Sequence, residues 1–264
     1  MSKTGEIRGE LNFRQLGGIR MKDGRTVRMN TLYRSGGLHL MNAQELEAVR
    51  QLKIRTVLDL RDRWSQKRKP DPEIGAVHVS YDGLPAKGGE SIDFSAAGFG
   101  KKGEAAAAQI EKVRQYYLDM PYGYQAFHAM FDALRSGAEP FLVHCTKGKD
   151  RTGLACILIL LALGAEEETA MQDYLLSNEY RKNEIAARLA EGRSVAPDDP
   201  GYMTLMYLRE GVKEQLGREI IAEIRKRSGT FEQYMAQEYG WNDAVLNEFR
   251  NHYLEQEPGR LSQE

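Results

Sequence analysis

The sequence predicts an α/β fold, with a central, mostly parallel sheet flanked by helices and a helical C-terminal extension. Short apolar, β-branched segments alternate with helical patterns in the first half of the chain, which is the order typical of parallel sheets. A wholly apolar helical pattern follows over residues 152–163, and from residue 166 onward the chain is almost continuous helix. We therefore expect residues 1–264 to form a single domain, with an α/β core over 7–165 and a helical extension packed on it over 166–257.

The N-terminal third of the chain is expected to contain short strands joined by tight turns. Asp23-Gly24 is a turn signal that favours a β-hairpin between the segments on either side. Asn42, with Glu45 three residues later, is the pattern of a capping box and predicts the start of a helix. Strands are predicted over residues 11–14, 31–34, 54–60 and 76–81.

The middle of the chain changes character twice. Residues 86–103 contain five glycines and little periodicity, which predicts a loop rather than a packed element. A helical pattern then runs to Leu134 with a break at Pro121, and residues 141–144 form a short apolar strand pattern. Breaks in the C-terminal helices are expected around residues 194–201 and at Gly229 and Gly240.

Composition and charge exclude several classes of protein. The 264 residues hold 37 lysines and arginines against 38 aspartates and glutamates, a net charge of −1, which is not the balance of a protein that coats nucleic acid. Hydrophobic residues at 41% are too many for a disordered chain, and two cysteines are too few for a disulfide framework. No apolar leader is visible, nor a segment of the ~20 apolar residues that cross a bilayer. We therefore expect a cytoplasmic protein without an integral membrane segment.

The most informative stretch is residues 141–153, in which an apolar strand leads through a five-residue loop into an apolar helix. Cys145 closes the strand, Gly148 lies in the loop and Arg151 opens the helix. Successive loop N–H groups and the positive end of the helix dipole create a site for an oxyanion, and the same field favours a thiolate. Arg151 adds a planar fork for two phosphate oxygens, and the Thr152 hydroxyl is placed to donate to the Cys145 sulfur.

A cysteine taken alone is more often a small buried hydrophobe than a nucleophile. For Cys145 the surrounding loop favours the nucleophile. For Cys156, which lies within an apolar helical pattern, we expect core packing. A redox enzyme of the arsenate-reductase kind is a remote alternative, because it needs a resolving cysteine and Cys156 is poorly placed for that role.

The pattern His-Cys-x-x-Gly-Lys-x-Arg-Thr-Gly over residues 144–153 is the signature of cysteine-dependent protein tyrosine phosphatases. With Asp150 inside it, the loop resembles that of the bacterial and fungal tyrosine phosphatase family, which includes mycobacterial and listerial tyrosine and lipid phosphatases. Residues 12–18 are similar to another segment of this family, with Gln15 in place of the usual aspartate. Further matches lie at residues 33–36, 56–61 and 174–178, so the resemblance covers most of residues 10–255 and implies a protein-tyrosine-phosphatase-like fold.

The resemblance implies a metal-independent phosphatase that hydrolyses phosphate monoesters in two steps and needs no cofactor. Cys145 would attack phosphorus, a phospho-cysteine would form, and water would release inorganic phosphate. No metal site is expected, because the loop amides and Arg151 neutralise the phosphate charge. The expected phosphate-binding residues are Thr146, Lys147, Gly148, Lys149, Asp150 and Arg151.

The general acid that protonates the leaving oxygen has two candidates. Asp150 lies inside the loop and is the residue that distinguishes the family. Asp82 follows the strand predicted over residues 76–81, where other tyrosine phosphatases have their acid on a mobile loop. Asp82 is also half of an Asp-Gly turn pair, which is its structural alternative. Both candidates stay open at this point.

Several further residues are expected to support the loop. Asp59 and Arg61 end a central strand at the sheet edge where sites form in α/β proteins, although an ion pair that only supports the fold is an equal alternative. His144 is expected to hold the loop and favour the thiolate without taking part in proton transfer. Residues expected near the site in a supporting or purely structural role are Asn12, Arg14, Arg34, Asp59, Arg61 and His144.

Phosphotyrosine in a phosphorylated protein is the expected substrate class. Phosphoinositides are the alternative, because Lys147 and Lys149 add two cations beside the loop and suit a substrate with more than one phosphate. Lys147 departs from the small residue that the family usually has there. A catalytically silent phosphate-binding protein is more remote, because Cys145 and Arg151 are both present.

The glycine-rich segment over residues 86–103 is long for a loop without structure, and such loops often cover or border a site. It follows the strand predicted to end near the catalytic loop. We expect it to border the Cys145 pocket, with Phe94 or Phe99 as an apolar wall. The alternative is an exposed insertion.

Overall fold

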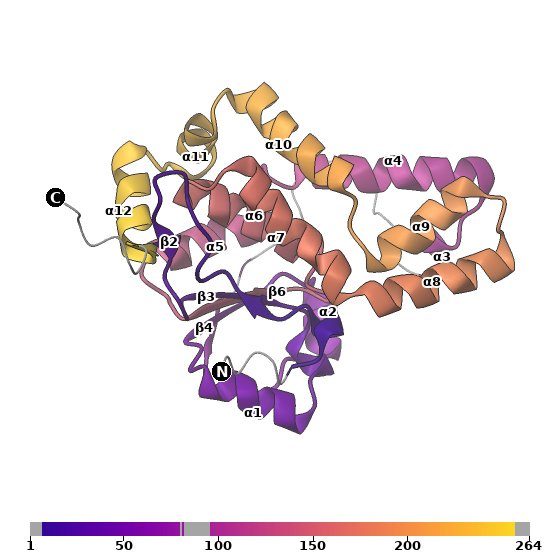
Figure 1. The fold of residues 1–264 in the computed structure, drawn as a ribbon, viewed down its shortest axis with the longest axis horizontal. Coiled ribbons are helices and arrows are strands. Elements are labelled where there is room, and N and C mark those ends of the chain that lie inside the picture. Colours follow the sequence, from indigo (N-terminus) through magenta and orange to yellow (C-terminus); the bar gives the residue numbers. More distant parts are fainter. Residues whose placement is uncertain (1–6, 80, 82–95, 257–264) are drawn as a thin grey trace.

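The computed structural model describes residues 7–79, 81 and 96–256, and its centre is a five-stranded sheet (Figure 1). The strand order is β1-β3-β6-β4-β5. Only β1 runs antiparallel to its neighbour, and the other pairs are parallel. The predicted mostly parallel sheet is therefore confirmed. The strands are β1 (Arg14–Gln15), β3 (Leu32–Ser35), β6 (Phe141–His144), β4 (Thr56–Asp59) and β5 (Val77–Val79).

The central strand β6 determines where a site can form. Its last residue, His144, lies opposite Ser35 of β3 and Asp59 of β4. Every residue of these three strands is buried, which is expected of parallel strands covered on both faces. Because the three strands end together, the polar residues that follow them meet at one edge of the sheet.

Helices cover both faces of the sheet (Figure 1). The helix α1 and the N-terminal segment enclose one apolar cluster, and α5, α6 and the C-terminal helices enclose a larger cluster on the other face. The helices before the catalytic loop are α1 (Ala43–Gln51), α2 (Arg63–Arg68), α3 (Ala96–Phe99), α4 (Gly103–Asp119) and α5 (Gln125–Arg135). Those after it are α6 (Arg151–Leu163), α7 (Glu167–Tyr180), α8 (Lys182–Val195), α9 (Pro200–Glu210), α10 (Glu214–Ser228), α11 (Phe231–Tyr239) and α12 (Asp243–Tyr253).

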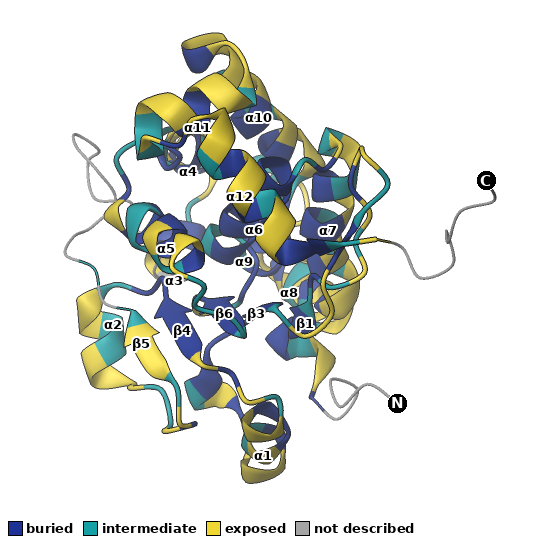
Figure 2. Ribbon diagram, turned by 90° about the vertical axis from the view of Figure 1, so that its left-hand side faces the viewer, coloured by how far each residue is buried: buried dark blue, intermediate teal, exposed yellow. Residues whose placement is uncertain are grey.

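The helix α6 is the axis of the larger cluster. All of its residues after Arg151 are buried, in agreement with an apolar pattern that has no polar face (Figure 2). It ends at Gly164, whose φ of 93° gives the left-handed cap that favours glycine. With 13 residues it is too short to cross a bilayer, and among the described residues no helix is both long and apolar enough to do so.

Two local predictions in the N-terminal third have different outcomes. The capping box of α1 is confirmed, since the Asn42 side chain accepts from the Glu45 N–H and the Glu45 carboxylate accepts from the Asn42 N–H. The turn at Asp23-Gly24 also forms, but the predicted hairpin is only an isolated bridge. The strand after the turn, β2 (Thr26–Val27), pairs instead with β7 (Leu254–Glu255) near the other end of the chain.

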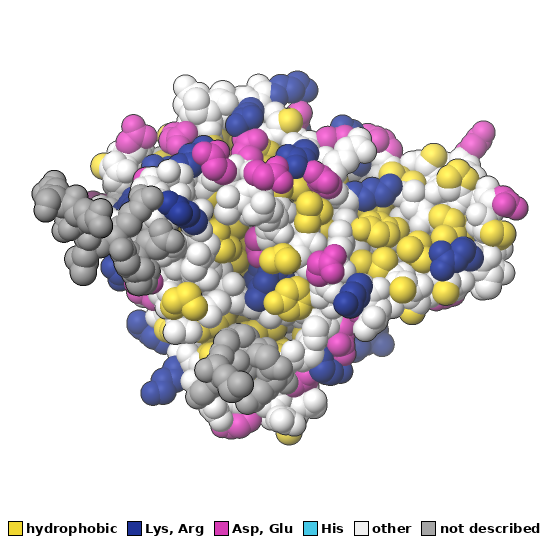
Figure 3. Space-filling view, viewed as in Figure 1, with side chains coloured by type: hydrophobic (Ala, Val, Ile, Leu, Met, Phe, Trp, Pro, Cys, Tyr) yellow, Lys and Arg dark blue, Asp and Glu magenta, His cyan; other side chains and the backbone are white. Residues whose placement is uncertain are grey.

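A smaller apolar cluster lies away from the sheet, where α3 and α4 pack on α9. The ring of Phe99 is buried there with Tyr202 and Leu205. The described part of the predicted loop over residues 86–103 is thus helical at Ala96–Phe99 and begins α4 at Gly103. Beside this cluster, apolar side chains gather on the surface of the C-terminal helices (Figure 3), where a shallow groove is lined by Leu175, Met203, Tyr207 and Val212.

Candidate active site

The loop between β6 and α6 holds the residues that the sequence singled out. Its tight course depends on Gly148, which has a φ of 67°. A Cβ atom at this position would lie 2.4 Å from the carbonyl carbon and oxygen of Ser35, the last residue of β3. Only glycine can therefore combine this backbone conformation with so close an approach to the neighbouring strand.

Cys145 follows β6 directly, and 4% of its surface is exposed. Burial raises the pKa of its thiol, but the Arg151 guanidinium and hydrogen bonds from the Thr152 hydroxyl and N–H lower it, and the net result is a pKa below the ordinary value. Among the described residues, the buried Thr152 hydroxyl has no other partner. The loop therefore favours a thiolate at Cys145.

Arg151 begins α6 and is held from one side. Its Nη1 atom donates to the carbonyl oxygen of Leu60, 2.7 Å away, just beyond the end of β4. Burial opposes its charge, yet the Cys145 thiolate raises the pKa of Arg151. Tyr116 and Tyr124 lie near enough to contribute to the same shift. These aromatic side chains form an apolar surround for the guanidinium.

A first buried network holds the loop from behind. The carbonyl oxygen of Gly148 accepts from Arg34 Nη2 and from Asn12 Nδ2, at 2.7 Å in each case. Both donors also reach the Ser177 hydroxyl of α7, at 3.1 Å from Asn12 and 3.3 Å from Arg34. Asn12 and Arg34, both expected near the loop, thus lie directly behind it together with Ser177.

The charge of this network is unbalanced. Arg14 and Arg34 both pair with the carboxylate of Asp173 on α7, and all three side chains are buried. Two guanidinium groups therefore share one carboxylate beneath the loop. The resulting field favours an anion above them, whether a thiolate or a phosphate.

A second buried network lies beside the first. The guanidinium of Arg61 lies 2.6 Å from Asp59 and 2.9 Å from Asp71. Nε2 of His144 is 2.8 Å from Asp71, and its Nδ1 faces the Cys145 carbonyl oxygen at 3.3 Å. The side chains of Asp59 and Arg61 thus form the ion pair given above as the structural alternative, and they do so next to the residue that precedes Cys145.

Carboxylate and imidazole atoms of Asp59, Asp71 and His144 all lie within 4.8 Å of one another, which is the arrangement of a candidate metal site. Two of these groups already have a cationic partner, because Arg61 lies between the two carboxylates. A metal ion would have to displace the buried guanidinium, so this donor set fits a resident cation poorly.

Comparison with known proteins agrees with this geometry. A model of the tyrosine phosphatase family matches residues 6–255, which is nearly the whole chain. The chain belongs to the tyrosine phosphatase family. The phosphatase is 33% identical to a candidate tyrosine-protein phosphatase of Cupriavidus necator over 190 residues, 70% of this chain and 68% of that protein. It is 27% identical to the triple-specificity protein phosphatase PtpB of Mycobacterium tuberculosis over 207 residues, 70% of this chain and 73% of that protein.

Membership confirms the predicted resemblance and the protein-tyrosine-phosphatase-like fold. The chain is an enzyme of the protein tyrosine phosphatase class, a phosphoric monoester hydrolase acting on phosphorylated substrates. The two cysteines of this phosphatase have different environments. Burial raises the pKa of Cys156 to about 11, so its thiol stays protonated in the core, as the apolar helical pattern predicts.

The lysines of the loop do not extend as free cations. Nζ of Lys147 lies 2.7 Å from both the Glu210 carboxylate and the Arg209 carbonyl oxygen, at the end of α9. Nζ of Lys149 is buried and lies 2.6 Å from the carboxylate of Asp150. Carboxylates of the phosphatase itself therefore pair with both lysines that the sequence offered for a second phosphate.

Two residues of the predicted site cannot be placed. Asp82 and Phe94 lie outside the described residues. Phe99, the other expected wall residue, is buried in the cluster between α4 and α9. Tyr81 is described, and it donates to the Arg61 carbonyl oxygen at 2.8 Å and meets Tyr124 edge to face. An aromatic side chain thus does border the site, from the residue just before Asp82.

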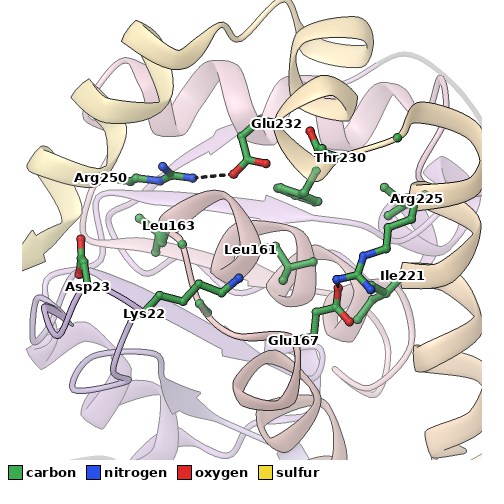
Figure 4. Close-up of a pocket in the computed structure, with 15 residues that line it drawn as sticks. Lys22, Asp23, Leu161, Leu163, Glu167, Ile221, Arg225, Thr230, Glu232 and Arg250 are labelled. Atoms are coloured by element: carbon green, nitrogen blue, oxygen red, sulfur yellow. Dashed lines mark hydrogen bonds and ion pairs between the residues drawn. The ribbon is translucent and has the colours of Figure 1, made fainter.

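A pocket at the other end of α6 is distinct from this site (Figure 4). Leu161 and Leu163 line it, near the end of the helix that Arg151 begins. Two ion pairs form between its lining residues, Arg250 with Glu232 at 3.5 Å and Arg225 with Glu167. At 1.5 Å per residue, α6 separates this pocket from the catalytic loop by roughly 20 Å.

Proposed function

We propose that the phosphatase acts through a phospho-cysteine formed on Cys145. The observation that supports this most is the environment of the thiol, which is buried yet has a lowered pKa because Arg151 and Thr152 face it. A thiolate attacks phosphorus, the ester oxygen leaves, and water then attacks the phospho-cysteine and releases inorganic phosphate. Thr152 stabilises the departing thiolate in the second step.

The phosphate is held by the loop and by Arg151. In this proposal the N–H groups of the loop and the start of α6 bind the oxyanion, and the guanidinium supplies two parallel donors. Lys147 contributes its backbone N–H rather than its ammonium, because that ammonium binds Glu210. The proposed phosphate-binding residues are Thr146, Lys147, Gly148, Lys149, Asp150 and Arg151.

Asp150 is the proposed general acid, with Asp82 as the alternative. The Asp150 carboxylate lies in the loop, and one of its oxygens pairs with Lys149 at 2.6 Å. The other oxygen is left for the leaving group.

Phosphotyrosine is the proposed substrate, within a phosphorylated protein. Tyr81, Tyr116 and Tyr124 lie around Arg151 and provide the aromatic surround that an aryl phosphate needs. A relative named as a triple-specificity phosphatase supports a wider range, and phosphoinositides are the second candidate. No nucleic acid partner is proposed.

The proposal treats residues 1–264 as one catalytic domain, in which the α/β core over 7–165 needs the extension over 166–257. Support comes from α7, whose Asp173 and Ser177 belong to the buried network behind the loop. A cytoplasmic location is proposed for the same chemistry, because a catalytic thiolate requires a reducing compartment.

The test is turnover of a substrate panel without added metal, in the parent and three variants. Cys145→Ser is expected to abolish release of phosphate from phosphotyrosine, phosphoserine and phosphoinositides while it still binds vanadate. Arg151→Lys is expected to be severely impaired, because an ammonium cannot replace the bidentate fork. Cys156→Ser is the matched control and is expected to stay active. Near-normal turnover by Cys145→Ser would overturn the mechanism.

A further inference from the structure

The helix α2 has an exposed tryptophan on a basic surface. Trp64 is 66% exposed, the largest such fraction for an aromatic side chain among the described residues. The guanidinium of Arg68 lies over its ring, 4.9 Å from the centroid. Exposure of a large apolar ring to water is unfavourable in free energy. The cation–π contact keeps the Arg68 charge beside the ring on the surface.

The sequence positions next to Trp64 carry charge of one sign, over residues 63–69. Arg63, Lys67, Arg68 and Lys69 are all exposed, and no acidic residue lies between positions 63 and 69. Within the described part of the chain, no carboxylate pairs with Lys67 or Lys69. The preceding Asp62 is occupied as the cap of α2, where its two oxygens accept from the N–H and hydroxyl of Ser65. We call Arg63, Trp64, Lys67, Arg68 and Lys69 the α2 patch.

The α2 patch is attached to the catalytic edge of the sheet. The side-chain amide of Gln66 donates to the carbonyl oxygens of Asp59 and Arg61, at 3.0 and 2.8 Å. Between them, the Leu60 carbonyl oxygen accepts from Arg151 at 2.7 Å. Figure 2 shows α2 on the same margin as the edge strand β5. Any ligand bound by the α2 patch therefore lies beside the catalytic loop.

We propose that the α2 patch binds the surface of an anionic lipid bilayer and so delivers the catalytic loop to phosphate esters at that surface. The clustered cations Lys67, Arg68 and Lys69 are the charge complement of acidic headgroups, and tryptophan is the side chain that favours the boundary between headgroups and acyl chains. A bound peptide would instead need a groove, whereas Trp64 projects from a short helix. Binding to the bilayer rests on the α2 patch alone, whereas delivery of the catalytic loop to phosphate esters rests on the proposed function.

Binding can be measured without catalysis, in the Cys145→Ser protein. The probes are phosphatidylcholine vesicles with and without phosphatidylserine. The chain has two tryptophans, and Trp241 is buried at 1% exposure, so a blue shift on binding reports Trp64. We expect sedimentation with the anionic vesicles only, a blue shift that Trp64→Ala abolishes, and release of the protein when salt is raised.

Charge reversal supplies a matched comparison. Lys67→Glu/Arg68→Glu is expected to weaken partition to anionic vesicles by more than about tenfold. Each cation near such a surface contributes about 1 kcal/mol of attraction, and its reversal adds repulsion. Lys182→Glu/Lys226→Glu makes the same change of net charge on other exposed helices and should alter partition less than about twofold. In the active enzyme, the first pair should leave turnover of a small soluble aryl phosphate unchanged.

Three outcomes would overturn the inference. The first is equal binding of neutral and anionic vesicles, and the second is an equal loss in both double variants. The third is binding of acidic phosphopeptides, but not of vesicles, through Trp64. Failure of the catalytic proposal is recognised separately, because it removes turnover of soluble substrates and leaves vesicle binding by the Cys145→Ser protein intact.

Discussion

Asp71 and His144 form a buried ion pair, with Nε2 of the imidazole 2.8 Å from the carboxylate. On its other side, Nδ1 of His144 faces the Cys145 carbonyl oxygen at 3.3 Å. Both facing groups are acceptors, which favours a proton on each ring nitrogen. Burial opposes this charge, but Asp71 and Asp59 raise the pKa of His144 above its ordinary value. Asp71 thereby positions the residue that precedes the nucleophile.

The variant Asp71→Asn tests this pair. Without the Asp71 carboxylate, only Asp59 still offsets burial, so the pKa of His144 should fall, as a ring-nitrogen NMR titration would show. Loss of one partner of a buried pair should cost about 3 kcal/mol in the free energy of unfolding. The exposed Asp132→Asn is the control and should change neither quantity. A His144 that stays charged in Asp71→Asn would contradict the assignment.

The same pair gives a pH dependence of stability. The pKa of His144 is raised from 6.5, so its contribution is complete below pH 6.5 and is lost as pH rises through the raised value. The pKa of Asp71 is lowered from 3.8 despite burial, because of His144 and Arg61, so its contribution is present above pH 3.8 and is lost as pH falls through the lowered value. The free energy of unfolding, measured with denaturant, should therefore differ most between the parent and Asp71→Asn from pH 3.8 to pH 6.5. A difference that is constant with pH would refute it.

Gly148→Ala should inactivate the enzyme for a steric reason. The added Cβ would meet the Ser35 carbonyl at 2.4 Å, so the loop must move, and displacement of a reacting group by about 1 Å can cost about a hundredfold in kcat/KM. Gly75→Ala is the matched control. Gly75 also has a positive φ, of 80°, but open space around it. Gly75→Ala should lose about 1 kcal/mol of stability and keep its turnover, whereas Gly148→Ala should lose more stability and its turnover as well. Equal activity in the two would show that the loop tolerates the methyl group.

Asp150→Asn should discriminate between leaving groups. A general acid contributes about 10²–10⁴-fold, and mainly where the leaving oxygen is strongly basic. We therefore expect a large loss of kcat on alkyl phosphates and a small loss on nitrophenyl phosphate. Asp82→Asn is measured beside it. If that variant instead has the leaving-group dependence, Asp82 is the acid and Asp150 is a positioning residue held by Lys149.

Lys147→Met should have little effect on substrate preference. Its ammonium binds Glu210, which also pairs with Arg181 at 2.6 Å and Arg188 at 3.3 Å. Two cations therefore remain in the variant, and because the lysine is partly exposed the loss of stability should be below about 1 kcal/mol. The ratio of activities on phosphotyrosine and on multiply phosphorylated inositol lipids should be unchanged. A selective loss on the lipids would show that Lys147 turns toward the substrate.

The parts of the site that depend on neighbouring residues could be predicted from the sequence. The strand before Cys145, the turn at Gly148 and the helix after Arg151 are all local patterns, and the structure contains each of them. The capping box at Asn42 and the core position of Cys156 are predictable for the same reason. In each case the deciding interactions lie within a few residues.

The supporting networks could not be predicted, because their partners lie far apart in the chain. Asp71 stands between two prolines in a stretch that has no periodic signal, and only the fold brings it to His144. On α7, Asp173 is one of several acids, and no local feature marks it as the partner of Arg14. The pairing of β2 with β7 could not be predicted for the same reason, since it joins opposite ends of the sequence.

The bonds behind the loop also determine when activity can first arise during protein synthesis. Asn12 and Ser177 are 165 residues apart, and Arg14 and Asp173 are 159 apart. Contacts of such sequence separation close late, because the intervening chain must first be ordered. A growing polypeptide that has only just completed Arg151 already contains every proposed phosphate-binding residue, but not the carboxylate that holds Arg14 and Arg34. The ribosome should therefore release no active phosphatase until α7 has emerged, and a translation product truncated before Asp173 should be inert.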